Sequence, residues 1–198
     1  MPIKLKNVCK SFDGQCILRD LNLTLSDGKA VCISGRSGLG KTTLLRMLMG
    51  LDKPDSGAIE GLDGLKVSAV FQEDRLCEAL SASANAAIAL KKGESRAFSD
   101  GLLREMGLEE DLMKPVSAMS GGMRRRVSIA RALSAEYDLL LLDEPFTGLD
   151  EKTRRAAIRC IMTHARGKTT VIVSHDGDIP AIFGCDTVDL EALMPPRM

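Results

Sequence analysis

The sequence predicts an α/β protein whose strands and helices alternate, and three observations support this prediction. A short apolar run at residues 31–34 leads into a glycine-rich loop and then into an apolar stretch of helical composition. Four consecutive leucines at 139–142 are typical of a strand that is buried on both faces of a parallel sheet. A helix at about 151–164 and another buried strand at 169–173 follow, so parallel strands with right-handed crossovers are expected.

The first quarter of the chain predicts strands joined by tight turns. Apolar and polar residues alternate over 3–6 and over 21–25, which is the period of a strand with one buried face. Asp-Gly pairs at 13–14 and 27–28 supply the chemistry of the turns.

The next elements along the chain are a helix and two short strands. The apolar stretch 42–49 predicts the helix, which Gly50 ends and after which Pro54 prevents its resumption. Further strand signals lie at 58–59 and 67–71, separated by glycines.

The middle of the chain changes character and predicts helices. It is rich in Ala, Leu, Glu and Lys, and Gly93, Gly101 and Gly107 are expected to divide it into helical pieces. Ser120 then has the position and chemistry of the N-cap of a further helix.

Composition restricts the class of protein. The chain has 198 residues, no formal net charge and 44% hydrophobic residues, which indicates one compact domain and excludes a disordered chain. Zero net charge and 3% aromatic residues argue against a nucleic-acid partner. The longest apolar run has five residues and the N-terminus has no signal core, so no membrane span and a cytosolic location are expected. Six scattered cysteines without a CxxC pair are expected to be small buried apolar residues rather than a zinc site or disulfides.

Residues 35–42, GRSGLGKT, match the pattern of a phosphate-binding loop, G-x-x-x-x-G-K-[ST]. They lie where a predicted strand leads into a predicted helix. The glycines allow the backbone N–H groups to converge on phosphate oxygens. Lys41 supplies a charge for the β- and γ-phosphates, and the Thr42 hydroxyl is a ligand for Mg²⁺. An ordinary glycine-rich turn is the alternative, and the four specified positions count against it. The nucleotide-binding residues predicted here are Gly35, Arg36, Ser37, Gly38, Leu39, Gly40, Lys41, Thr42 and Thr43.

A second predicted part of the site follows the four leucines. Asp143 comes at the carboxyl end of this strand, where open α/β sheets place their ligands, and is expected to hold Mg²⁺ through water. Glu144 beside it is the candidate general base for the attacking water. The alternative is a core strand that ends in a polar turn.

Residues 119–127, MSGGMRRRV, are similar to the LSGGQ signature of the ATP-binding subunits of ABC transporters, and the resemblance covers nearly the whole chain. A serine and two glycines at a helix start leave N–H donors that suit an anion. The resemblance implies that Ser120, Gly121 and Gly122 cover the γ-phosphate held by a partner subunit in a head-to-tail dimer. The alternative is a helix cap without a partner.

The resemblance also implies roles for residues elsewhere in the chain. Gln72 falls at the Q-loop, whose glutamine senses Mg²⁺ and the attacking water, and Asp150 lies in the D-loop motif GLD. His175 matches the switch histidine that contacts the γ-phosphate, and Phe12 lies where the family stacks an aromatic ring on adenine. A phenylalanine in the core of a hairpin is the alternative for Phe12. His164 has no motif context and is expected to be a solvated helix residue.

The implied fold is a P-loop NTPase core of the ABC ATPase type with a small antiparallel β subdomain and a helical insertion. One domain over 1–198 is expected, with the β subdomain and nucleotide-binding core at about 1–72, the insertion at about 73–119 and the rest of the core at about 120–198. The catalytic residues implied are Lys41, Gln72, Glu144 and His175, and the metal ligands are Thr42, Gln72 and Asp143.

Two residues depart from the signature of the family. Met119 replaces the usual leucine, which conserves volume, and Met123 replaces the usual glutamine, which removes an amide. Met123 and the segment 71–76, FQEDRL, resemble the importer branch for nitrate, sulfonates and taurine.

The function implied is an ATPase subunit that uses ATP and Mg²⁺, lies on the cytoplasmic face of the cell membrane and energises a separate permease. Import of a small anion or sulfonate-like solute, with an extracytoplasmic solute-binding protein, is expected from the branch. The alternative is a non-transport ABC ATPase in translation or DNA repair, although those usually have two cassettes or a long coiled coil. A cassette that binds ATP without hydrolysing it is disfavoured, because Lys41, Asp143, Glu144 and His175 are all present.

Overall fold

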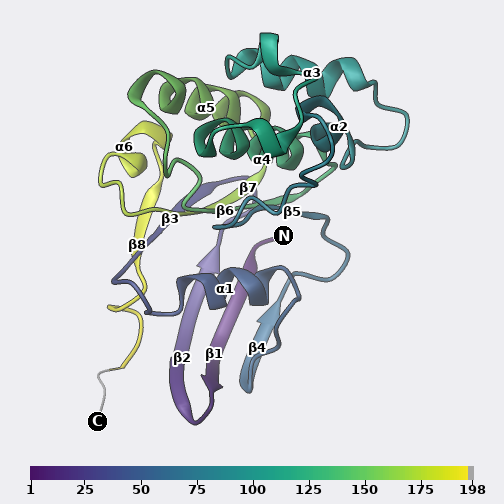
Figure 1. Ribbon diagram of the computed structural model, residues 1–198. Helices are drawn as coiled ribbons and strands as arrows, with labels where there is room; N and C mark the ends of the chain where they lie inside the picture. The colour runs from purple at the N-terminus through teal and green to yellow at the C-terminus, as the bar shows by residue number, and fades with distance from the viewer. Residues whose placement is uncertain (196–198) are drawn as a thin grey trace. The chain divides into compact units, whose positions relative to one another are not determined.

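The computed structural model describes residues 1–195 (Figure 1). The last three residues of the range expected at 120–198 lie outside the described residues. The chain forms two compact units, each described by itself below. Unit 1 contains residues 1–65 together with the segment that begins at Gly167, and unit 2 contains Lys66–Arg166.

Unit 1 contains an antiparallel sheet, as the resemblance implied. β1 (Ile3–Phe12), β2 (Gln15–Leu25) and β4 (Ser56–Glu60) lie in the order β2-β1-β4. Leu5 pairs with Leu23, and both are buried on the same face. The Asp13-Gly14 turn joins β1 to β2, and both of its residues have positive φ, which Asp and Gly tolerate.

Unit 1 also contains parallel strands with helices between them. β3 (Ala30–Ser34) pairs in parallel with β7 (Thr169–Val173) and with β8 (Asp186–Asp189). α1 (Lys41–Leu48) follows β3 through the glycine-rich loop, and a short α6 (Ile179–Phe183) leads to β8. α1 buries an apolar face that includes Leu44, Leu45, Met47 and Leu48.

Unit 2 contains a further pair of parallel strands. β5 (Val67–Val70) pairs with β6 (Leu139–Asp143), and Val70 lies opposite Leu142. All four leucines of β6 are fully buried, which confirms the prediction of a strand covered on both faces.

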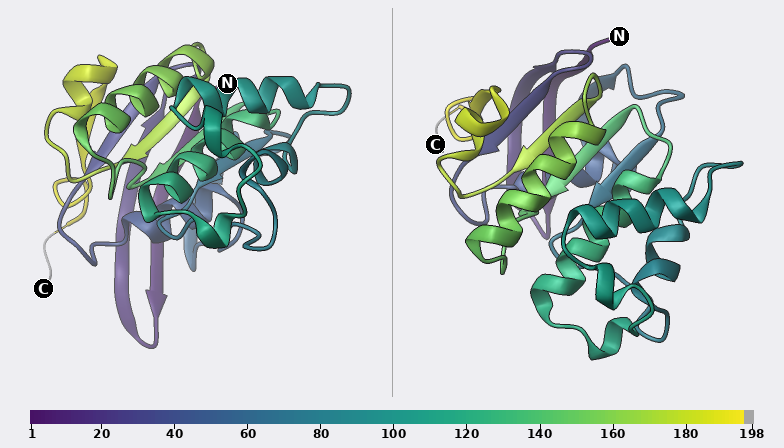
Figure 2. Two further views of the ribbon diagram at one scale, coloured as in Figure 1. Left: turned by 45° about the horizontal axis from the view of Figure 1, so that its top comes forward. Right: turned by 90° about the horizontal axis from the view of Figure 1, so that it is seen from above.

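The helices of unit 2 agree with the prediction in all but one respect. They are α2 (Ala82–Ala87), α3 (Arg96–Glu105), α4 (Gly121–Ser134) and α5 (Glu151–His164), with 3₁₀ turns η1 (Glu109–Asp111) and η2 (Val116–Ala118). Figures 1 and 2 show α2 and α3 beside α4.

Gly101 does not break the helical stretch, so that prediction is wrong. It lies inside α3, whereas Gly93 and Gly107 have positive φ outside the helices and do interrupt them. A glycine inside a helix costs about 1 kcal/mol relative to alanine. Burial of the neighbouring Leu102 and Leu103 offsets that cost, because each fully buried leucine contributes roughly 1.5–3 kcal/mol.

His164 is a second correction, because it is not simply solvated. Its Nε2 lies 3.0 Å from Oε2 of Glu105, and its ring meets the Phe98 ring edge-to-face with centroids 5.9 Å apart. The expectation for the cysteines is also wrong in part. Cys32 and Cys160 are buried but Cys77 is exposed, and none of the six cysteines forms a disulfide.

None of the helices within residues 1–195 is long and apolar enough to cross a membrane.

Candidate functional site

The glycine-rich loop of unit 1 has the backbone shape that its sequence demands. Gly35, Gly38 and Gly40 all have positive φ. A Cβ at Gly40 would lie 2.7 Å from Cγ2 of Ile17, and one at Gly35 would lie 2.6 Å from Cδ2 of Leu39. The positive φ therefore favours glycine at these two positions, and a Cβ would also require the neighbouring side chains to move.

Lys41 is held inside this loop. Its Nζ donates hydrogen bonds to the carbonyl oxygens of Gly35 at 2.6 Å and Arg36 at 3.0 Å, and the residue is only 7% exposed. Both acceptors belong to the loop itself, so the ammonium is positioned within the curve of the predicted phosphate-binding backbone. Because these hydrogen bonds already restrict the rotamers of the Lys41 side chain, less conformational entropy is lost when it binds a phosphate.

A cavity of about 320 Å³ adjoins the loop in unit 1. Arg36 and Glu191 both line it, and Nε of Arg36 donates a hydrogen bond of 3.0 Å to Oε2 of Glu191. Its lining residues are Cys16, Ile17, Arg19, Arg36, Leu39, Glu191, Met194 and Pro195.

Phe12 lies at the end of β1 and is 44% exposed, with Nζ of Lys10 5.3 Å from its ring centroid. The alternative of a core phenylalanine is therefore wrong.

His175 and the phosphate-binding loop leave the parallel strands of unit 1 at the same edge. Ile33 of β3 pairs with Val173 of β7, and Gly35 and His175 each follow two residues later. His175 is exposed there. The carboxyl ends of parallel strands are where α/β sheets bind ligands.

Unit 2 repeats this arrangement with the other predicted residues. Val70 pairs with Leu142, so Gln72 and the Asp143-Glu144 pair also follow neighbouring strand ends. Asp143 is 4% exposed, whereas Gln72 is exposed. Glu144 has a φ of +49°, a conformation that costs a residue other than glycine about 1–3 kcal/mol and is concentrated at functional positions.

Ser120 caps α4, as predicted, and its Oγ accepts a hydrogen bond of 3.3 Å from the Met123 N–H. The two glycines that follow differ in their surroundings. A Cβ at Gly122 would lie 3.0 Å from the Gly148 carbonyl oxygen, whereas one at Gly121 would meet nothing within 4 Å.

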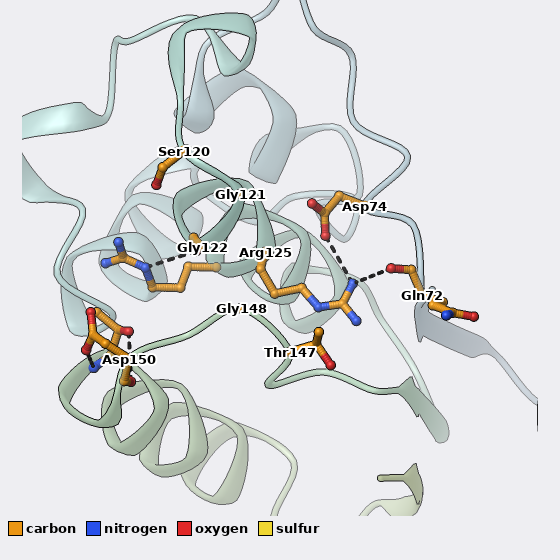
Figure 3. Close-up of a pocket in the computed structure, with 11 residues that line it drawn as sticks. Gln72, Asp74, Ser120, Gly121, Gly122, Arg125, Thr147, Gly148 and Asp150 are labelled. Carbon is orange, nitrogen blue, oxygen red and sulfur yellow. Dashed lines mark hydrogen bonds and ion pairs between the residues drawn. The ribbon is translucent and has the colours of Figure 1, made fainter. Parts of the chain in front are cut away.

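Three segments that are distant in the sequence line one pocket of about 540 Å³ in unit 2 (Figure 3). Of the predicted site residues, the pocket brings together Gln72, Ser120, Gly121, Gly122 and Asp150. Its other lining residues are Asp74, Arg125, Arg126, Thr147, Gly148 and Thr153.

Asp150 has a structural role at this pocket as the N-cap of α5. Its Oδ1 accepts a hydrogen bond of 2.9 Å from the Thr153 N–H. That bond is the largest reason why the pKa of Asp150 lies below its usual value, and the charge of Arg126 adds to it. Asp150 is therefore ionised at neutral pH.

Arg125 is the residue of this site that sequence reasoning missed. Its guanidinium is buried, and it donates to carbonyl oxygens on both sides: to Phe71 at 2.6 Å and Gln72 at 3.3 Å, and to Asp143 at 2.7 Å and Glu144 at 2.6 Å. A further bond reaches Oδ1 of Asp74 at 3.0 Å (Figure 3). Another reaches the Pro145 carbonyl at 3.3 Å. The signal that could have revealed this role is that a charged residue, Arg125, lies on the buried side of α4.

The predicted site residues thus lie in two groups. Phe12, Lys41, Thr42 and His175 belong to unit 1, whereas Gln72, Ser120, Asp143, Glu144 and Asp150 belong to unit 2.

Comparison with known proteins identifies the family. The sequence profile of the family described as "ABC transporter" matches residues 18–147. The aliphatic sulfonates import ATP-binding protein SsuB 2 of Pseudomonas syringae pv. syringae is 41% identical over 94% of this chain and 68% of its own length. The taurine import ATP-binding protein TauB of Pseudomonas aeruginosa is 37% identical over 92% of this chain and 73% of its own length. The spermidine/putrescine import ATP-binding protein PotA of Fusobacterium nucleatum is 42% identical over 88% of this chain, which spans half of that protein.

Solved structures agree with the sequence comparison. The dimeric structure of the bacterial ABC transporter cassette MJ0796 superimposes with a TM-score of 0.83 and 30% identity, covering 95% of this chain and 94% of that one. Its post-hydrolysis state bound to ADP and phosphate gives a TM-score of 0.81 at 29% identity over the same shares of the two chains. With the profile covering most of the sequence and the relatives covering nearly all of it, the chain belongs to the ABC transporter family, and it is an ATP-binding subunit of that family with ATPase activity.

Proposed function

We propose that this chain is the ATP-hydrolysing subunit of an importer and that its ATP sites are completed by a second copy of the chain. The observation that supports this most is the pocket of unit 2, which gathers Gln72, Ser120 and Asp150 from three separate segments. These residues are the Q-loop, signature and D-loop residues of the motif pattern. Their convergence on one pocket supports the motif assignments.

The nucleotide is proposed to bind at the loop 35–43, with its adenine against Phe12. The N–H groups at the start of α1 and the positive end of the helix suit the phosphates, and Lys41 adds a charge to the β- and γ-phosphates. The exposed ring of Phe12 is available for stacking. On binding, Lys41 would exchange the loop carbonyls of Gly35 and Arg36 for phosphate oxygens.

The donor atoms of the proposed metal ligands suit Mg²⁺. Thr42 offers a hydroxyl, Gln72 an amide oxygen and Asp143 a carboxylate, and hard oxygen donors are what Mg²⁺ prefers. These three residues would hold the ion, which supplies charge neutralisation for the phosphates when bound.

Hydrolysis is proposed to rely on positioning and charge. Glu144 accepts the proton of the attacking water as general base, and His175 donates a hydrogen bond to the γ-phosphate. Two features fix the backbone from which the Glu144 side chain extends. One is its strained φ, and the other is the set of hydrogen bonds from Arg125 to the carbonyls of residues 143–145.

The partner at the signature is proposed to be a second copy in head-to-tail orientation. Ser120 and the free space at Gly121 present the start of the 14-residue helix α4 to the pocket. Such a helix start attracts an anion, here the γ-phosphate bound to the phosphate loop of the other copy.

The relatives also support proposals for the remaining partners. A separate membrane permease is proposed to dock on unit 2 near Gln72, with apolar contacts from Leu76 and the 40% exposed Leu80. This places the chain on the cytoplasmic face of the membrane, with an extracytoplasmic solute-binding protein in the same system. The names of the relatives with the largest coverage favour a sulfonate-like solute over a polyamine. A role in translation or DNA repair is not favoured, because these relatives are named as import subunits.

The test of the proposed chemistry is Glu144→Gln, which preserves shape and removes the base. Steady-state ATPase activity should fall by at least about a hundredfold, the usual contribution of general base catalysis, while ATP affinity is retained. Glu136→Gln is the matched control, since Glu136 is another carboxylate of unit 2 but pairs with Lys66 at the surface. Turnover near the parent rate in Glu144→Gln would remove Glu144 as the base.

A further inference from the structure

A cluster of three potential metal ligands lies in unit 2, away from the pocket described above. Cys160 and His164 are four residues apart on α5, so they lie on the same face of that helix. Glu105 comes from the last turn of α3, which packs against α5 (Figure 1). One donor atom from each side chain lies within 4.8 Å of the other two.

The distances within the cluster are close to those of a metal site. Nε2 of His164 lies 3.1 Å and 3.0 Å from the two carboxylate oxygens of Glu105. Zn²⁺ binds N and O ligands at about 2.0–2.2 Å and S at about 2.3 Å, which puts tetrahedral ligand atoms roughly 3.3–3.7 Å apart. Small side-chain rotations would bring the sulfur, which lies at most 4.8 Å from the other two donors, into this range.

We propose that Glu105, Cys160 and His164 form a binding site for Zn²⁺. The thiolate and carboxylate balance the two charges of the ion, and a neutral imidazole completes three protein ligands. One thiol, one imidazole and one carboxylate are a donor set for zinc rather than for Mg²⁺ or Ca²⁺, which take oxygen ligands. Water is left as the fourth ligand, since Glu105 is exposed and His164 is partly exposed.

The surroundings of the cluster favour a defined site over a mobile surface group. Cys160 is 2% exposed, and the edge of the Phe98 ring packs on the imidazole of His164. The Tyr137 hydroxyl donates a hydrogen bond of 3.2 Å to the His164 carbonyl oxygen. These contacts hold two of the ligands in place before an ion binds, so less side-chain entropy is lost on binding.

An ion pair between Glu105 and His164, with the Cys160 thiol hydrogen-bonded to Glu105, is the competing account. Burial raises the pKa of Cys160, and Glu105 raises it further, so the thiol is protonated without a metal. A bound ion must therefore displace a proton from sulfur. The two accounts differ in whether the sulfur contributes to binding.

The experiment measures Zn²⁺ binding to the full chain by competition with a chromophoric chelator. One ion per chain is expected, and affinity should fall at least roughly tenfold in Cys160→Ser, because even outer-shell changes have effects of that size. Cys77→Ser is the matched control, since Cys77 is the exposed cysteine of the same unit, and its affinity should equal that of the parent.

Two further measurements keep the proposal falsifiable. Co²⁺ bound to the parent should show a thiolate-to-metal charge-transfer band that Cys160→Ser lacks, and Glu105→Gln, a change at the surface, should weaken Zn²⁺ binding in a chain that folds normally. Absence of stoichiometric Zn²⁺ binding, or equal affinity in the parent, Cys160→Ser and Glu105→Gln, would overturn the proposal.

Discussion

The Arg125 side chain joins two loops that carry most of the proposed chemistry of unit 2. Its six hydrogen bonds connect the Phe71–Asp74 segment with the Asp143–Pro145 turn. Its bonds to the Asp143 and Pro145 carbonyls are buried, so these two oxygens would be left away from water if they lost their partner. Leaving a buried polar group unpaired costs about 1–3 kcal/mol. Arg125 is therefore both a structural residue and the group that fixes the separation of Gln72 and Glu144.

Arg125→Lys tests whether the geometry of the guanidinium, rather than its charge, contributes to the stability of the fold. A lysine has three donors on one atom and cannot reach acceptors on both sides of the planar guanidinium. We expect a loss of about 2–4 kcal/mol in the free energy of unfolding, measured by urea denaturation. Arg155→Lys is the control, because Arg155 pairs with Glu151 at the surface, and it should change stability by less than about 0.5 kcal/mol. A stability equal to that of the parent would mean that these carbonyls find other partners.

The start of α4 contains two adjacent glycines with different requirements. Gly122 lies against the backbone of the loop before α5, where its missing Cβ leaves room for the Gly148 carbonyl oxygen. Gly121 faces open space and has an ordinary helical backbone. One glycine is thus needed for packing within the chain, and the other is free to serve a partner.

Alanine at each position should separate stability from activity. Gly122→Ala should lower the unfolding free energy by about 1–3 kcal/mol, because a Cβ 3.0 Å from a backbone oxygen forces the two segments apart. Gly121→Ala should leave thermal stability unchanged or raise it by about 0.5–1 kcal/mol, since alanine is the better helix former. ATPase activity should nevertheless fall in Gly121→Ala, because the methyl group occupies the proposed phosphate contact. Full activity with Gly121→Ala would argue that α4 has only a capping role.

Elements of strong local pattern were predictable from the sequence. α5 has the bounds that were predicted, and β6 coincides with the four leucines plus Asp143. Gly101 shows the limit of local reasoning, because tertiary burial of its neighbours decides that the helix continues. Helix propensity has little influence on where a helix ends when tertiary packing opposes it.

At the scale of the whole molecule, motif order located the candidate site but not the contacts that support it. The phosphate loop, Gln72, Ser120 and Asp150 were predicted from short patterns whose chemistry is local. The contacts of Arg125 and the contact between Glu105 and His164 were not predicted, since they join positions 18 to 59 residues apart. The hydrophobic periodicity of one element does not indicate which distant segment that element will contact.

The central claim is that the start of α4 acts on ATP held by a second copy, and dimer formation tests it directly. Glu144→Gln should accumulate with ATP bound, so size-exclusion chromatography in ATP should show a dimer. Adding Ser120→Arg to this variant puts bulk and positive charge at the proposed interface. Ser95→Arg is the matched control, because Ser95 caps α3 in the same way, with its Oγ 3.2 Å from the Ala97 N–H.

The account predicts that the Glu144→Gln, Ser120→Arg double variant binds ATP with parent affinity and elutes as a monomer. The Glu144→Gln, Ser95→Arg variant should elute as a dimer. An ATP-dependent dimer that persists in the Ser120→Arg double variant would contradict the account, because the start of α4 would then lie outside the interface between copies.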